Sequence, residues 1–149
     1  MTIEEVVNLT PNGLHDSYLL GLSVDYAMRV AAFRIKWDLG MVDPDNTQDF
    51  VEGTLSLNGL QYLVIEPPWK DDRYEKATYG YDEPSYIDGY VTRDEDIARL
   101  NLPTIPHTAS RYSIFVGEWK SFIHFAAESA AIDPRELLVR VTRSVADAV

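Results

Sequence analysis

The segment LHDSYLLGLSVDYAMRVAAFRIKW, residues 14–37, decides the fold that we expect, because hydrophobic and polar residues alternate along both of its halves. Successive side chains of a strand point to opposite faces of a sheet, so this alternation predicts two strands, each with one buried face. A polar turn joins them into a hairpin. The residues expected on the buried face are Leu20, Leu22, Val24, Tyr26, Ala31, Phe33, Ile35 and Trp37. Those expected on the solvent face are Gly21, Ser23, Asp25, Ala32, Arg34, Lys36 and Asp38.

Two further hairpins are indicated later in the chain. Residues 50–57 alternate again, and Asn58–Gly59 is a strong signal for a tight hairpin turn before the apolar run 60–65. Another hairpin is predicted over residues 112–127, with its turn at Gly117–Glu118. Strands that follow one another in this way favour antiparallel pairing.

Helices are predicted near both ends of the sequence. Thr2 and Glu5 have capping-box spacing at the start of a short helix over residues 2–7. Asp133–Pro134 is a good helix start for residues 133–148, although a strand over part of this segment is an alternative. We therefore expect a single domain over residues 1–149 of the α+β class, mostly β. Its architecture would be an antiparallel sheet or flattened sandwich built from sequential hairpins, with a C-terminal helix.

The composition limits the classes of partner. The chain of 149 residues has a net charge of −11 and no cysteine. Nucleic acids and anionic membranes would repel such a chain, whereas a basic protein would be attracted. No run is long and apolar enough to span a membrane, and the first residues lack the basic region of a signal peptide. We expect a cytoplasmic protein without disulfides.

Residues 67–101 form a long acidic, tyrosine-rich segment with little periodicity, and at most a short strand at 87–91 and a helical turn near 95–100 are predicted within it. Tyrosine dominates recognition surfaces, and carboxylates speed the encounter with a basic partner. This segment is therefore the predicted partner-binding surface, although its rings would equally serve to cover the core beneath a loop. The predicted contact residues are Tyr74, Tyr79, Tyr81, Asp82, Glu83, Tyr86, Asp88 and Tyr90.

Histidines are the other candidates for chemistry. His15–Asp16 lies between a turn and a strand, where side chains satisfy backbone groups, and neighbouring strand residues point in opposite directions. We therefore predict a structural role for this pair. His107 and His124 lack metal-ligand spacing, and His124 is expected either to face solvent or to pack with a satisfied nitrogen. No catalytic residue, metal or cofactor is predicted.

Three segments carry a family resemblance: Gly13–Ser17 with the strand that follows it, residues 53–60, and the hairpin over residues 112–128. Together they resemble a loose group of small acidic bacterial proteins known as domains of unknown function or as immunity proteins of polymorphic toxin systems. The resemblance implies a sheet-rich fold and, for some members, the binding and silencing of a toxin. It implies no catalytic residues.

Two functions are consistent with these features. The first is a non-enzymatic protein-binding protein, of immunity type, that uses the acidic tyrosine-rich surface against a basic partner. The alternative is a small enzyme or ligand-binding domain with a pocket lined by carboxylates and aromatic rings. A flat exposed surface would favour the first, and a pocket with converging acids the second.

Overall fold

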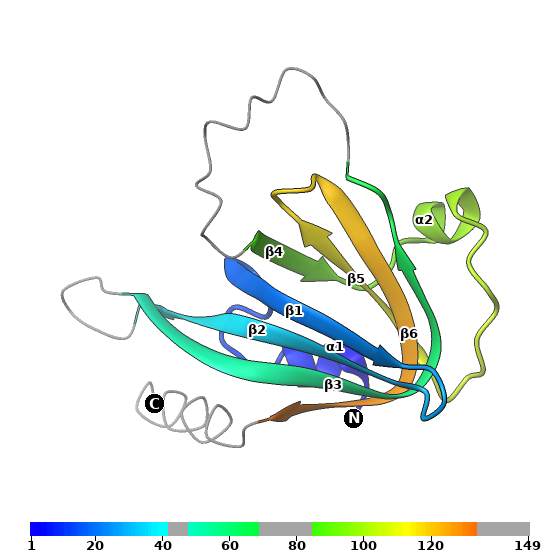
Figure 1. Ribbon diagram of the computed structural model, residues 1–149, viewed down its shortest axis with the longest axis horizontal. Coiled ribbons are helices and arrows are strands. Elements are labelled where there is room, and N and C mark those ends of the chain that lie inside the picture. Colours follow the sequence, from blue (N-terminus) through cyan, green and yellow to red (C-terminus); the bar gives the residue numbers. More distant parts are fainter. Residues whose placement is uncertain (42–47, 69–84, 134–149) are drawn as a thin grey trace.

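The computed structural model describes residues 1–41, 48–68 and 85–133 (Figure 1). Its strands are β1 (Ser17–Asp25), β2 (Val30–Met41), β3 (Gln48–Ile65), β4 (Ser85–Tyr90), β5 (Ser110–Val116) and β6 (Ser121–Asp133), and its helices are α1 (Ile3–Val7) and α2 (Asp94–Arg99). Every strand pairs antiparallel with its neighbours, which confirms the predicted mostly-β class. The order is β1-β2-β3-β6-β5-β4, and pairing of β4 with β1 closes the sheet into a barrel. The predicted C-terminal helix lies outside the described residues.

The first hairpin is β1 and β2, and the predicted buried face of β2 is confirmed. Phe33, Ile35 and Trp37 are fully buried, and Ala31 is nearly so. Their alternation points them into the barrel, as the sequence pattern requires. Strand β2 therefore supplies a large part of the core.

The predicted buried face of β1 is only partly correct. A bulge between Leu19 and Gly21 shifts the register, so Leu19 packs against the core together with Leu22 and Val24. An extra residue in a strand reverses the alternation on one side of the bulge, which no simple period of two anticipates. Tyr26 lies in the turn, 85% exposed, so its predicted burial is wrong.

The predicted solvent face of the hairpin also needs two corrections. Arg34 is exposed as expected, while Lys36 is half-buried with its ammonium 5.3 Å from the centre of the Phe50 ring. Asp38 is buried, contrary to the prediction. Its carboxylate accepts a 2.8 Å bond from the Gly40 N–H, and its own N–H donates to Ser17 Oγ, so local hydrogen bonds compensate its burial.

The predicted turn at Asn58–Gly59 is wrong, because β3, which is 18 residues long, continues through these two residues. Asn58 lies opposite Val30, the first residue of β2, and beyond this point β3 pairs with β6 alone. Gly59 takes a left-handed φ of 65°, and the register shifts between Leu60 and Tyr62. Such a glycine and bulge bend a strand without ending it. Figure 1 shows β3 curving towards α2.

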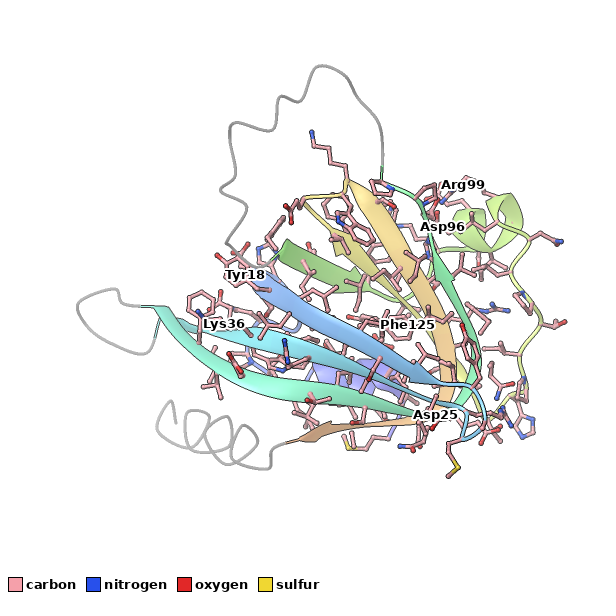
Figure 2. The ribbon with its side chains drawn as sticks, in the orientation of Figure 1. Tyr18, Asp25, Lys36, Asp96, Arg99 and Phe125 are labelled. Carbon is pink, nitrogen blue, oxygen red and sulfur yellow. The ribbon has the colours of Figure 1, made fainter. Side chains whose placement is uncertain are left out.

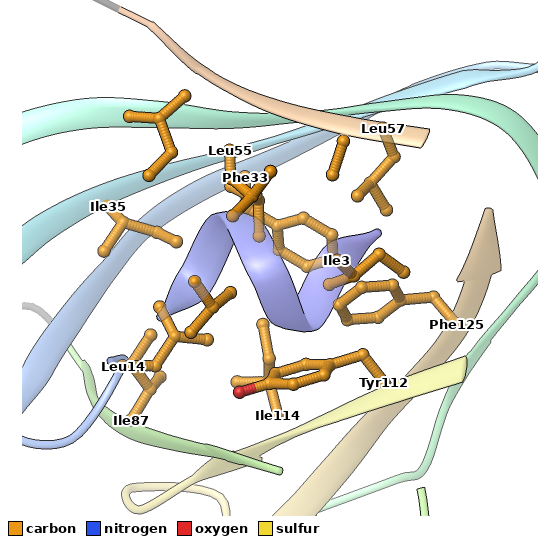
Figure 3. Packing of buried hydrophobic residues seen from close by; sticks show 14 of the residues in the cluster. Ile3, Leu14, Phe33, Ile35, Leu55, Leu57, Ile87, Tyr112, Ile114 and Phe125 are labelled. Atoms are coloured by element: carbon orange, nitrogen blue, oxygen red, sulfur yellow. The ribbon is translucent and has the colours of Figure 1, made fainter. Parts of the chain in front are cut away.

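Helix α1 lies among the side chains that fill the barrel (Figure 3). Its predicted capping box is confirmed: Thr2 Oγ1 accepts from the Glu5 N–H, and the Glu5 carboxylate accepts from the Thr2 N–H. Its buried residues are Ile3, Val6 and Val7, which join the same core cluster as Phe33 and Phe125. The helix therefore completes the core.

Helix α2 instead covers the outer face of the barrel. Because side chains alternate along β6, Ile123 and Phe125 point inward, whereas Ala126 belongs to a second cluster with Tyr62 and Leu102. Ile97 and Leu100 pack against that cluster. The short strand and helical turn predicted within residues 67–101 correspond to β4 and α2. In the part of the chain that the structure describes, no helix is long and apolar enough to cross a membrane.

Candidate functional site

A pocket of about 650 Å³ lies on the outer face of the barrel, where α2 meets the end of β3 and the start of β6. Figure 2 shows Asp96 and Arg99 of α2 on this side of the molecule. The charged residues that line the pocket are Glu66, Arg93, Asp96, Arg99 and Lys120. Its rings come from Pro67, Pro68, Tyr90 and Phe122. Acids, cations and aromatic rings therefore converge at one place.

Glu66 is held by the backbone before its side chain makes any contact. It directly follows β3, where its N–H donates to the Phe122 carbonyl over 3.0 Å. The Ser121 hydroxyl donates to the Glu66 carbonyl over 2.9 Å. Pro67 comes next and has no N–H to continue the strand ladder. The end of β3 is thus fixed against β6, with the Glu66 carboxylate at the pocket.

A buried chain of hydrogen bonds supports this carboxylate from below. Ser113 and His124 are direct partners across β5 and β6, and both are fully buried. His124 Nε2 lies 2.8 Å from Glu66 Oε2, and Nδ1 lies 2.7 Å from Ser113 Oγ. Thr92 Oγ1 lies 2.7 Å from Ser113 Oγ. When His124 is neutral, the carboxylate selects the tautomer that carries its proton on Nε2. Nδ1 then accepts a hydrogen bond from the Ser113 hydroxyl, and the Thr92 hydroxyl donates to Ser113 Oγ.

Arg99 supports the same carboxylate from α2. Its Nη1 and Nη2 donate to Oε1 and Oε2 of Glu66 over 2.7 and 3.2 Å, and Nη2 also donates to Asp96 over 3.0 Å. The Arg99 bonds, followed by the His124 bond, hold the pKa of Glu66 below its usual 4.5. The two carboxylates in turn raise the pKa of Arg99. Glu66 is therefore ionised and fixed in orientation at neutral pH.

Tyr90 presents a hydroxyl that is buried and, among the described residues, has no hydrogen-bond partner. Burial, with the nearby Asp96 carboxylate, raises the pKa of Tyr90 to about 12, so the phenol keeps its proton. The Arg93 guanidinium lies 4.6 Å from the centre of the Tyr90 ring. Phe122 meets the same ring edge-on, with 5.9 Å between centroids. The ring is fixed while its hydroxyl is left with an unused donor.

Ser113, His124 and Glu66 are the residue types of a hydrolase triad, and hydrogen bonds link them in that order. Glu66 lines the pocket, however, whereas in a hydrolase the serine would have to do so. Ser113 is fully buried, and its hydroxyl lies between His124 and Thr92. A nucleophile must reach its substrate, so Ser113 is not one. A carboxylate with a lowered pKa is also a poor general base near neutral pH. The arrangement is suited to holding a ligand.

The structure describes three of the predicted partner-binding residues, Tyr86, Asp88 and Tyr90, which alternate along β4 on its outer face. Tyr86 is 40% exposed and Asp88 is half-buried, whereas Tyr90 lines the pocket. The other five lie outside the described residues: Tyr74, Tyr79, Tyr81, Asp82 and Glu83.

His15 and Asp16 lie far from the pocket residues in sequence and form their own exposed cluster. His15 Nδ1 is 3.3 Å from Asp88 Oδ2, and Nε2 is 3.5 Å from Asp16 Oδ2. The prediction that the two neighbours point apart is wrong, because Asp16 has a left-handed φ of 58° in a turn before β1. In the described segments, no three His, Cys, Asp or Glu side chains are placed to hold a metal ion.

Sequence reasoning missed Glu66, Arg99 and Ser113 as site residues. For His124 the second of the two expectations is correct, since it is buried with both nitrogens bonded. One signal was available: the turn that pairs Val116 with Ser121 also places Ser113 opposite His124. A polar pair facing each other across a hydrophobic hairpin indicates a buried hydrogen bond.

Fold and site together define the class: a closed antiparallel barrel whose core includes one face of a short helix, with a polar, ring-lined pocket on its outer face. Comparison of the chain with protein-family models, with curated proteins and with solved structures gave no match.

Proposed function

We propose that this protein is a non-enzymatic binding domain that holds a small organic ligand in the pocket between α2 and β6. The single observation that carries the proposal is the fixed Glu66 carboxylate, bonded by Arg99 on one side and by buried His124 on the other. Polar groups that are fixed in advance lose little entropy when a ligand arrives, so they favour binding.

The pocket has the volume of a ligand site, although its wall carries more charged residues than most. Such sites are typically concave, about 300 to 1,000 Å³ in volume, and lined by rings with a few oriented polar groups. Here Tyr90 and Phe122 supply the rings, and Glu66, Asp96 and Arg93 supply the polar groups.

Backbone amide shifts in NMR spectra test this proposal directly. A library of small acids, bases, neutral polar compounds and aromatic compounds is added to the labelled full chain. We expect at least one compound to shift the amides of residues 90–99 and 120–124 and to leave those of the β1–β2 turn unchanged. Shifts from no compound, or shifts spread over the whole barrel, would contradict a pocket-specific binding role.

A second candidate function is the binding of a basic cytoplasmic protein, of immunity type, by the tyrosine-rich segment. The observation that favours it is the exposed outer face of β4, where Tyr86 and Asp88 lie. With a basic partner in hand, Asp88→Asn should slow association and Tyr86→Ala should speed dissociation. A partner whose kinetics are unchanged by both substitutions would exclude this face.

A further inference from the structure

The charges at the pocket wall have both signs and are close together. Glu66 and Asp96 are bridged by Arg99, and Arg93 lies over the adjoining Tyr90 ring. An anionic ligand would approach two carboxylates, and a cationic ligand would approach two guanidinium groups and the Lys120 ammonium, which also lines the pocket. Either charge would meet a repulsive neighbour in a partly desolvated site, which is costly. A neutral ligand avoids both costs.

The pocket wall still has both hydrogen-bond donors and hydrogen-bond acceptors to offer. An arginine has five N–H donors, and the bonds to Glu66 and Asp96 use three of those on Arg99. Asp96 uses Oδ1 for this contact, and within the described residues no bond engages Oδ2. A hydroxyl group both donates and accepts, so neighbouring hydroxyls match such a wall.

The rings supply the remaining surface. Tyr90 and Phe122 meet edge to face, and Phe122 also lies 5.7 Å from the His124 ring in a stacked arrangement. Pro67 and Pro68 line the pocket beside them. Such rings pack well against the C–H groups of a saturated ring, because they are rigid and largely apolar.

From these observations we infer that the ligand is a neutral cyclic polyol, such as a sugar, bound with its hydroxyls on the Glu66–Arg99–Asp96 network and its C–H face on the aromatic rings. This inference rests on the proposed function and specifies its ligand class. It requires no reaction, and each hydroxyl keeps its proton.

The test compares neutral sugars with charged sugars built on the same ring. Glucose, galactose, mannose and myo-inositol are titrated into the full chain, alongside the uronic acids and amino sugars that correspond to the three hexoses. We expect at least one neutral compound to bind with a Kd of about 1 mM or tighter, and its charged counterparts to bind about tenfold more weakly or not at all. Tyr90→Leu should weaken binding of the neutral compound about fivefold to tenfold, because it removes an aromatic ring that lines the pocket. The matched control is Tyr26→Leu, which removes a tyrosine ring from the exposed β1–β2 turn and should change nothing.

The outcomes separate this inference from the proposed function. A uronic acid or amino sugar that binds as tightly as its neutral counterpart overturns the polyol and leaves the pocket as a ligand site. If no sugar shifts the pocket amides while another library compound does, the polyol is again excluded. If no compound of any class shifts them, the proposed function fails as well. Equal affinities for the Tyr90→Leu and Tyr26→Leu variants would also overturn the inferred binding mode.

Discussion

His124 and Glu66, which lie 58 positions apart in the sequence, are joined by a 2.8 Å contact between Nε2 and Oε2. The imidazole is fully buried, while the carboxylate reaches the pocket. Behind the imidazole, Ser113 and Thr92 continue the hydrogen bonds between β5 and the chain after β4. The pocket wall is therefore anchored in the sheet, and its polar groups are fixed before any ligand binds.

Replacing His124 with alanine should destabilise the fold. The buried Ser113 hydroxyl would lose its acceptor and keep only its contact with Thr92, and one oxygen of Glu66 would lose a donor. A buried polar group left without a partner costs about 1 to 3 kcal/mol, so the free energy of unfolding should fall by about 3 kcal/mol. Urea denaturation measures this change. The matched control is His107→Ala, which removes an exposed histidine and should have an effect below about 0.5 kcal/mol.

The low pKa of Glu66 predicts a pH dependence of stability. The folded state holds this pKa below 4.5, so the folded state favours the ionised form and gains stability from it above that pH. That contribution disappears as the pH falls through the lower, folded-state value. The stability difference between wild type and Glu66→Gln should therefore be largest near neutral pH and shrink below about pH 4.5. Urea midpoints measured from pH 7 to pH 3 test this, and a difference that does not change with pH would contradict it.

Arg99→Lys should weaken the network although it keeps the positive charge. A lysine ammonium cannot reproduce the paired Nη1 and Nη2 bonds to both oxygens of Glu66. Because the Arg99 side chain is half-exposed, we expect a modest loss of about 1 kcal/mol in urea denaturation. Arg34→Lys, on the exposed face of β2, is the control and should cost less than about 0.5 kcal/mol. Equal losses would show that the paired geometry is unimportant.

The buried face of β2 gives a test of the core. Phe33 is fully buried, and its ring centroid lies 4.9 Å from that of Phe125. Phe33→Ala should lower the free energy of unfolding by about 3 to 5 kcal/mol, whereas Tyr26→Ala in the exposed turn should have little effect. A loss below about 1 kcal/mol for Phe33→Ala would contradict the packing of the barrel.

Local patterns account for much of the fold. The alternation of β2, the capping box of α1 and the turn between β5 and β6 all depend on residues close together in the sequence, and each is confirmed. Two features misled the prediction in the same way. A bulge follows Leu19 in β1, and Gly59 lies near another bulge in β3. Whether such a glycine makes a turn or a bend depends on the neighbouring strand, which the local sequence does not reveal.

The site depends on contacts that are distant in the sequence. Glu66, Arg99 and His124 meet because β3 pairs with β6 and α2 packs across both. Closure of the barrel likewise depends on the pairing of Ser17 with Ile87, far apart in the chain. No local period encodes these pairings, so Ser113 and His124, which one hairpin brings together, are the only part of the network within reach of sequence reasoning.

The central claim is that the pocket beside Glu66 binds a small ligand, and the affinity of one arginine variant tests it most directly. Arg93 lines the pocket with its guanidinium over Tyr90, yet its side chain is 62% exposed, so Arg93→Ala should fold normally. Arg34→Ala removes an equally charged, exposed side chain from β2 and serves as the control. Calorimetric titration with the tightest-binding library compound should show about tenfold weaker binding to Arg93→Ala and unchanged binding to Arg34→Ala. Equal affinities for wild type and both variants would contradict the assignment of this pocket as the binding site.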